Sequence, residues 1–246
     1  MIKNIKNIKN IMFYHPLVYA AVMLYISVGF FTLSAGDRSA NYLFAEDHYF
    51  ENVGAISLFL TSFLFFYTFW LTLKSKPRDI FSRIKLLAVL GLAVIAFFGA
   101  AEEISWGQRI LDLQTPETLA QVNVQDEISV HNIEINEKPI PFEKLFDLFW
   151  LTFTVIIPLA GLFNMQFRQF GNKIFFILPL GLGCLFFFNY LWAKAAQILF
   201  VSVYSFHRVP FIQAVQEIKE SNYEVLFVFA ALYVLQDLKL KRNTGN

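Results

Sequence analysis

The densest group of reactive side chains in this 246-residue chain is the run AEEISWGQR at residues 101–109. Its polar and amphipathic members are Glu102, Glu103, Trp106, Gln108 and Arg109. A carboxylate can act as a general base or a metal ligand, and an arginine can hold an anionic group with two hydrogen bonds. If the preceding helix continues, Glu102 and Arg109 share one face, because residues seven apart align. The same residues could instead only fix the depth of a membrane helix.

A second polar group follows at residues 123–132, NVQDEISVHN. Asn123, Gln125 and Glu127 are candidates to bind a substrate, together with Trp106 and Gln108. His131 is a candidate acid, base or metal ligand beside Glu102, Glu103 and Arg109. Aliphatic residues alternate with polar ones here, which predicts short extended pieces. A helical alternative would put Glu127, His131 and Glu134 on one face.

A third group lies on a segment that begins near Pro210, a residue suited to the first turn of a helix. Glu217, Glu220 and Glu224 are spaced to share one face, which predicts an amphipathic helix on the membrane surface. Glu220 alone fits a solvated position, whereas Glu217 and Glu224 are better site candidates. Clustered carboxylates favour proton or metal binding. A divalent metal held by Glu103, His131 and Glu217 is therefore one hypothesis.

The composition indicates which elements position these groups. Hydrophobic residues make up 57% of the chain and charged ones only 16%, with a mean hydropathy of +0.51. A spanning helix needs about 20 apolar residues. The sequence predicts an all-α integral membrane protein of one domain with six transmembrane helices. The predicted spans are residues 17–35, 53–73, 84–101, 145–165, 174–201 and 225–238.

The distribution of charge predicts the orientation. With both termini inside, the inner segments contain thirteen of the twenty basic residues and only two of the nineteen acidic ones. Such a bias is typical of cytoplasmic loops. We therefore expect a multi-pass protein of the cytoplasmic (inner) membrane, with a long extracytoplasmic loop at residues 102–144. Carboxylates then stand at the outer ends of three spans, as Glu51, Glu102 with Glu103, and Glu224.

These motifs resemble a group of uncharacterised bacterial polytopic membrane proteins. The matching pattern is ED…E at residues 46–51, EEISWGQR, the dipeptide Pro116-Glu117, and N-x-Q-x-E-x-x-x-HN at residues 123–132. Asp126 stands where the group commonly has glycine. The resemblance covers the first half of the chain and implies a site without naming a reaction. A weaker analogy is to membrane hydrolases of the alkaline ceramidase type, although their cluster of three histidines with an aspartate is not evident.

Three functions remain open from the sequence. The first is a membrane-embedded hydrolase or transferase that acts on a lipid or lipid-linked substrate at the outer leaflet. The second is a small transporter or sensor coupled to a cation or proton, although ionisable residues deep in the spans are few. The third is an assembly protein that binds a partner through its outer loop. Nucleic-acid binding is not expected, because the basic residues are scattered and follow the topology.

Overall fold

The computed structural model describes residues 16–35, 49–75, 79–108, 110–121, 123, 128–129, 133–135, 138–139, 141–203 and 208–243. The long helices are α2 (Pro16–Phe31), α4 (Tyr49–Lys74), α5 (Ile80–Glu103), α10 (Leu180–Val203) and α11 (Arg208–Asn243). The shorter elements are η1 (Thr32–Ala35), η2 (Ser105–Gly107), α6 (Glu117–Ala120), β1 (Glu134–Ile135), β2 (Lys138–Pro139), α7 (Phe142–Trp150), the π-helical η3 (Leu151–Ile156), α8 (Ile157–Phe163) and α9 (Met165–Ile174).

Five helical segments of the described chain are long and apolar enough to cross a membrane. They are Pro16–Ser34, Tyr49–Lys74, Ile80–Glu103, Lys144–Phe163 and Leu180–Leu199. Large apolar side chains point out of the bundle on these segments; Phe63 is 67% exposed and Ile198 is 71% exposed. Such surfaces suit a hydrocarbon environment rather than water. The predicted helical, multi-pass membrane character is confirmed at this level.

The sixth predicted span, 225–238, is part of α11, which has 36 residues and is not among the five apolar segments. The predicted surface helix before it is wrong, because Phe211, Val215 and Ile218 are buried. Both differences have one cause. Helix α11 packs against α4, α10 and α2, so its surface is covered by protein and does not need to be uniformly apolar.

Two other boundaries also differ from the prediction. The span expected at 174–201 begins only at Leu180, because α9 ends at Ile174 and a non-helical stretch leads to Pro179. The span expected at 145–165 ends at Phe163, since Asn164 caps the next helix through its side chain.

At the start of α5, Asp79 accepts hydrogen bonds from the Ser82 backbone and hydroxyl. These bonds hold the pKa of Asp79 below its usual range.

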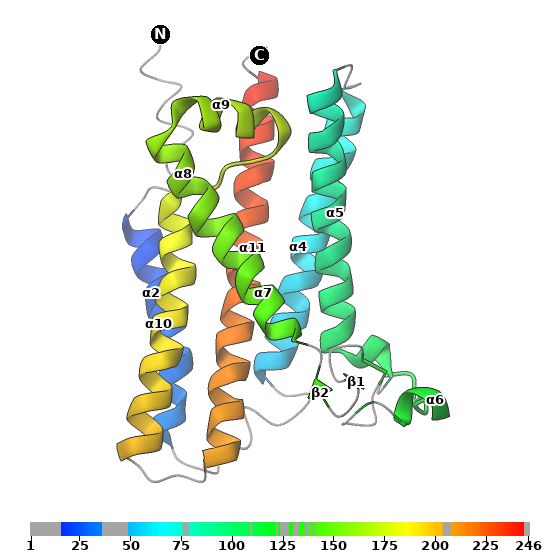
Figure 1. Cartoon of the computed structure of the whole chain (residues 1–246), viewed down its shortest axis with the longest axis vertical. Coiled ribbons are helices and arrows are strands. Elements are labelled where there is room, and N and C mark those ends of the chain that lie inside the picture. The colour runs from blue at the N-terminus through cyan, green and yellow to red at the C-terminus, as the bar shows by residue number, and fades with distance from the viewer. Residues whose placement is uncertain are drawn as a thin grey trace.

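Figure 1 shows the long helices side by side, with α11 among α4, α10 and the α7–α8 segment. The end of α5, the start of α4 and the elements α6, β1 and β2 lie at one end, which we call the acidic end. Helix α9, the start of α5 and the ends of α4 and α11 lie at the other, the basic end. Helix α5 therefore ends and α7 begins at the acidic end, and the segment that connects them contains many of the predicted site residues.

Close packing of α10 against η3 depends on Gly183. A Cβ atom at this position would overlap the carbonyl oxygen of Thr154, which is backbone and cannot rotate away. Thr154 is itself buried, and its hydroxyl donates to the Trp150 carbonyl over 2.8 Å. Helix α10 can thus keep its position only with glycine at residue 183.

We predict that Gly183→Ala lowers the stability of the detergent-solubilised protein by about 1–3 kcal/mol, the usual cost of overpacking an interior. Gly91→Ala on α5 is the matched control, since a Cβ there meets no atom within 4 Å. Thermal unfolding measures both variants. Equal melting temperatures for the two would contradict the packing described here.

Candidate functional site

Helix α5 ends within the AEEISWGQR run instead of continuing through it. Glu103 is the last helical residue, and the next turn has positive φ angles at Ser105 (45°), Trp106 (54°) and Gly107 (75°). Positive φ is strained for residues other than glycine, and such strain is concentrated at functional sites. The expected helical face joining Glu102 to Arg109 is therefore wrong. Arg109 itself lies outside the described residues.

The left-handed turn brings Trp106 back over the end of α5. Its indole Nε1 donates to Glu102 Oε1 over 2.6 Å. The Trp106 ring also meets the Phe98 ring edge-on, with centroids 5.2 Å apart. The indole hydrogen bond holds the Glu102 side chain in place at the end of α5.

Glutamates from three helices converge beside this turn. Electrostatic interactions link Glu103 of α5 to Glu51 of α4 and to Glu217 and Glu220 of α11. Glu224 of α11 in turn interacts with Glu103 and Glu51. We call Glu51, Glu102, Glu103, Glu217, Glu220 and Glu224 the glutamate cluster. These interactions place acids from the ends of α4, α5 and α11 near one another, and Glu220 is only partly exposed. A common site built from them stays a prediction.

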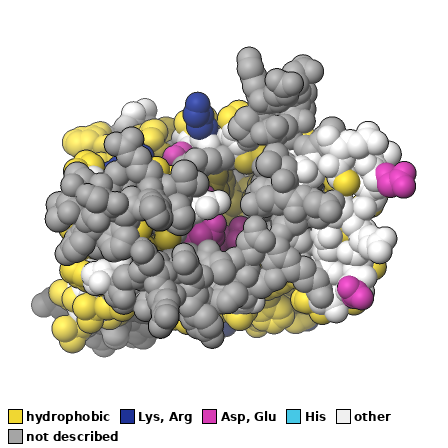
Figure 2. Space-filling view, turned by 90° about the horizontal axis from the view of Figure 1, so that it is seen from below, with side chains coloured by type: hydrophobic (Ala, Val, Ile, Leu, Met, Phe, Trp, Pro, Cys, Tyr) yellow, Lys and Arg dark blue, Asp and Glu magenta, His cyan; other side chains and the backbone are white. Residues whose placement is uncertain are grey.

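The cluster reaches from the surface into the bundle. Seen from the acidic end, Figure 2 shows Asp and Glu side chains in a recess near the middle of the face. Within the cluster, Glu224 is the most buried glutamate, with 5% of its surface exposed, and Glu102 and Glu103 are partly exposed. The carboxylate of Glu224 occupies the space that a side chain at Gly54 would fill. Glycine at position 54 of α4 is therefore what admits Glu224 to the helix interface.

A serine hydroxyl belongs to the same face of α11. Ser221 lies four residues after Glu217 and three before Glu224, so the three side chains share a stripe. Ser221 is 3% exposed, and within the described part of the chain its Oγ has no hydrogen-bond partner. Serines and threonines inside helices commonly bond to the carbonyl four residues earlier, as Thr68 does. The Ser221 hydroxyl remains available to a bound molecule between two acids.

A second polar group fills the side of α11 that faces α10, and the sequence analysis did not single it out. The side chain of Asn222 donates to Asn189 Oδ1 over 3.0 Å, and Asn189 Nδ2 donates to the Lys219 carbonyl over 2.8 Å. Asn189, Asn222 and the side chain of Lys219 are buried. The signal was present in the spacing of Lys219 and Asn222, three residues apart. It was not recognised because polar residues on a helix are interpreted as exposed to solvent unless the helices that cover them are known.

Two of the predicted substrate-binding residues organise the loop between α5 and α7. Gln108 donates to Thr115 Oγ1 over 2.9 Å and accepts from the Ile128 backbone. Asn123 is buried and donates to the Ser129 carbonyl over 2.8 Å. An isolated bridge joins Asn123 to Ile133, and β1 pairs with β2 antiparallel. The predicted extended conformation is confirmed at Asn123 and at residues 133–135, and the helical alternative is wrong at Glu134, which is in β1. Most of residues 124–132 lie outside the described residues.

The predicted metal site is not assembled among the residues that the structure describes. Within them, no group of three His, Cys, Asp or Glu side chains could hold a metal ion. His131, Gln125 and Glu127 fall outside the described residues, so their predicted roles stay predictions. Glu103 and Glu217 do lie in one cluster, but as a pair of acids rather than as part of a complete ligand set.

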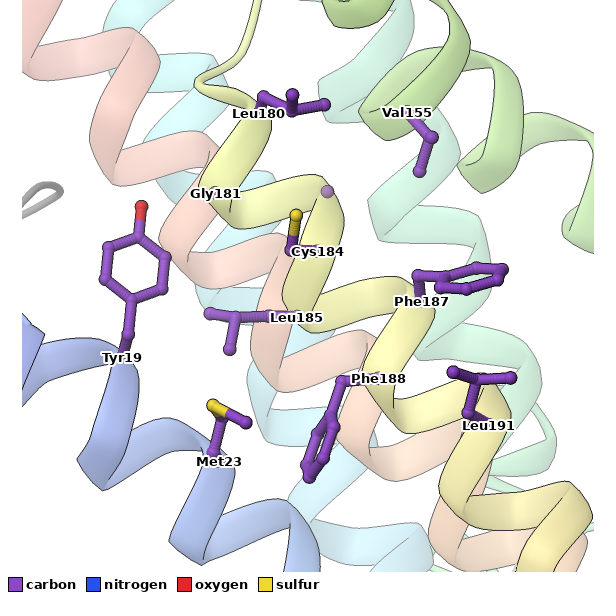
Figure 3. Close-up of a pocket in the computed structure, with 11 residues that line it drawn as sticks. Tyr19, Met23, Val155, Leu180, Gly181, Cys184, Leu185, Phe187, Phe188 and Leu191 are labelled. Carbon is purple, nitrogen blue, oxygen red and sulfur yellow. The ribbon is translucent and has the colours of Figure 1, made fainter.

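A separate apolar groove of about 500 Å³ lies between α2, α10 and η3. Figure 3 shows Tyr19 and Met23 of α2 on one side and Cys184, Leu185 and Phe188 of α10 on the other. Its lining contains no Asp, Glu, His, Lys or Arg, so it is chemically distinct from the glutamate cluster.

No protein-family model, curated protein or solved structure matches this chain. The predicted resemblance to uncharacterised bacterial membrane proteins therefore stays a prediction.

We predict that Trp106→Phe lowers stability by about 1 kcal/mol, because it keeps the aromatic contact with Phe98 and removes the hydrogen bond to Glu102. Trp70→Phe is the matched control at the basic end, where the Trp70 ring stacks on Tyr67. Thermal unfolding of the two variants in the same detergent measures the difference. If Trp70→Phe is as harmful as Trp106→Phe, the indole hydrogen bond has no special role.

Proposed function

We propose that the protein is a membrane-embedded hydrolase or transferase that performs acid–base chemistry at one surface of the bilayer. One observation carries the proposal: the buried carboxylate of Glu224 on α11 lies against Gly54 of α4, three residues from Glu51 and at the end of the bundle where Glu103 ends α5. Neighbouring carboxylates in a water-poor place suit the roles of general acid and general base. The cluster lies where α5 ends, so a lipid or lipid-linked substrate could reach it from the membrane.

The proposed topology has six spans, with α11 as the sixth and both termini in the cytoplasm. Support comes from Figure 1, where α2 begins and α11 ends toward the same end of the bundle, the basic end. With about 1.5 Å of rise per residue, the 36 residues of α11 extend for about 54 Å and exceed a hydrocarbon core of about 30 Å. The excess length allows the glutamates of α11 to lie at the outer surface of the bacterial inner membrane.

Three glutamates of the cluster and the neighbouring Ser221 have proposed roles. Glu103 is the base that takes a proton from water or from a substrate hydroxyl, and Glu224 returns a proton to the leaving group. Ser221 orients the bound group through its available hydroxyl. Glu102, held by Trp106, borders the entrance. His131 and Arg109 keep their sequence-based roles as a second acid–base group and an anion-binding group, and a divalent metal bound with His131 remains part of the hypothesis.

A second function has one specific observation in its favour. Thr61 of α4 is 1% exposed, and within the described chain its hydroxyl has no hydrogen-bond partner. Thr61 lies seven residues after Gly54, so both residues are on the face of α4 that contacts Glu224. Polar groups therefore extend from the glutamate cluster further into the bundle. A proton-coupled transporter would use such a continuation. Two ionisable residues within the predicted spans, Lys194 and Asp147, do not continue this row of polar groups. Lys194 is exposed, and Asp147 accepts a hydrogen bond from Trp150.

The test combines substitution with a chemical probe that needs no known substrate. Mass spectrometry measures the turnover of lipids in a bacterial lipid extract. Glu103→Gln and Glu224→Gln should each lower this turnover by about 100-fold or more. Dicyclohexylcarbodiimide, which reacts with carboxyl groups in apolar surroundings, should modify Glu103 or Glu224 in the wild-type protein.

Glu117→Gln is the matched control, because Glu117 is an exposed acid at the same end and outside the cluster. It should leave turnover unchanged, and the carbodiimide should not mark it. Full activity of Glu103→Gln or Glu224→Gln would contradict the enzyme proposal. Proton flux in liposomes that depends on Thr61 and Glu224, without lipid turnover, would favour the transporter instead.

A further inference from the structure

The basic end of the bundle carries a helix that lies across the others. Asn164 leaves the helical conformation (φ −130°, ψ 104°) and turns the chain out of α8, and its side chain then caps α9 by accepting from the Phe167 backbone over 2.9 Å. Figure 1 shows α9 crossing the end of the bundle at a steep angle to α11. A ten-residue helix in this position can lie flat at a membrane surface.

The two faces of α9 differ sharply in chemistry. Phe167, Phe170 and Ile174 follow the spacing of one helical face, while Arg168, Gln169 and Lys173 fall on the other side. No residue of α9 is buried, and Phe167 and Phe170 are 39% and 52% exposed. The apolar face therefore has large aromatic side chains that the rest of the protein covers only in part.

The contacts of α9 orient its apolar face toward the spanning helices. Phe170 meets Phe81 near the start of α5, with ring centroids 6.0 Å apart. Gly171 lies against Ile177, where an added Cβ would be 3.0 Å from the Ile177 side chain. Lys85 of α5 donates to the Asn172 carbonyl over 2.8 Å and so ties α9 to the bundle. The partly exposed aromatic face is thus held at the level where α5 begins.

We propose that α9 is an in-plane helix embedded in the leaflet at the basic end, where Arg168 and Lys173 bind anionic phospholipid headgroups. Aromatic residues on one face and bases on the other are the composition of helices that lie in a membrane interface. Further bases at the same end, among them Lys74, Arg83 and Lys239, add to the attraction for an anionic leaflet. The proposal is independent of the chemistry at the glutamate cluster.

Depth measurements on two sites of α9 test the in-plane position. Cys184 is the single cysteine of the chain, so Cys184→Ala gives a background for Phe167→Cys and Gln169→Cys, each carrying a nitroxide label. In vesicles of phosphatidylcholine with phosphatidylglycerol, the label at 167 should collide mainly with oxygen and the label at 169 mainly with a water-soluble nickel chelate. Equal access of the nickel chelate to both labels, or shielding of the label at 167 from both reagents by a protein partner, would overturn the proposal.

A stability measurement tests the lipid headgroup. The wild-type protein in nanodiscs should melt at a higher temperature with phosphatidylglycerol than with phosphatidylcholine alone, and high salt should remove the gain. Arg168→Gln/Lys173→Gln should lose most of this gain, whereas the charge-conserving Arg168→Lys/Lys173→Arg should keep it. A full gain in the neutral double variant would show that these two bases do not bind the anionic lipid.

Discussion

The structure depends on the placement of an acidic helix face inside a membrane bundle. Helix α11 directs Glu217, Glu220 and Glu224 toward α4 and α5, where they meet Glu103 and Glu51. Like charges repel most strongly when water is excluded, so this arrangement opposes folding unless protons or bound groups reduce the charge.

The rest of the fold allows this arrangement in specific ways. Gly54 provides the space that the Glu224 carboxylate fills, and burial of Ile218 and Val215 holds the neighbouring part of α11 in place. The Asn189–Asn222 hydrogen bond fixes α11 against α10 on its opposite side. The turn at Ser105 to Gly107 ends α5 beside the cluster and brings Trp106 onto Glu102. Packing on one side of α11 thereby supports the acidic face on the other.

The sequence predicted much of this arrangement and missed its centre. Apolar runs placed α4 and α5 within a few residues, because a lipid-facing helix must be uniformly apolar. The same rule failed for α11, whose protein-covered surface tolerates Lys219 and Asn222. The acids at helix ends were identified from position alone, and their convergence follows from helix packing that no local pattern encodes. The left-handed turn after Glu103 was not predicted, because positive φ at Ser105 and Trp106 contradicts the preferences of both residues.

The convergence of Glu103 and Glu224 is the central claim, and cross-linking tests it most directly. In the Cys184→Ala background, Glu103→Cys/Glu224→Cys should be joined by a short bifunctional thiol reagent in native membranes. The joined product is detected by mass spectrometry as a link between α5 and α11. Glu117→Cys/Glu224→Cys should remain unjoined under the same conditions. A linked control pair with an unlinked pair at 103 and 224 would contradict the account of the cluster.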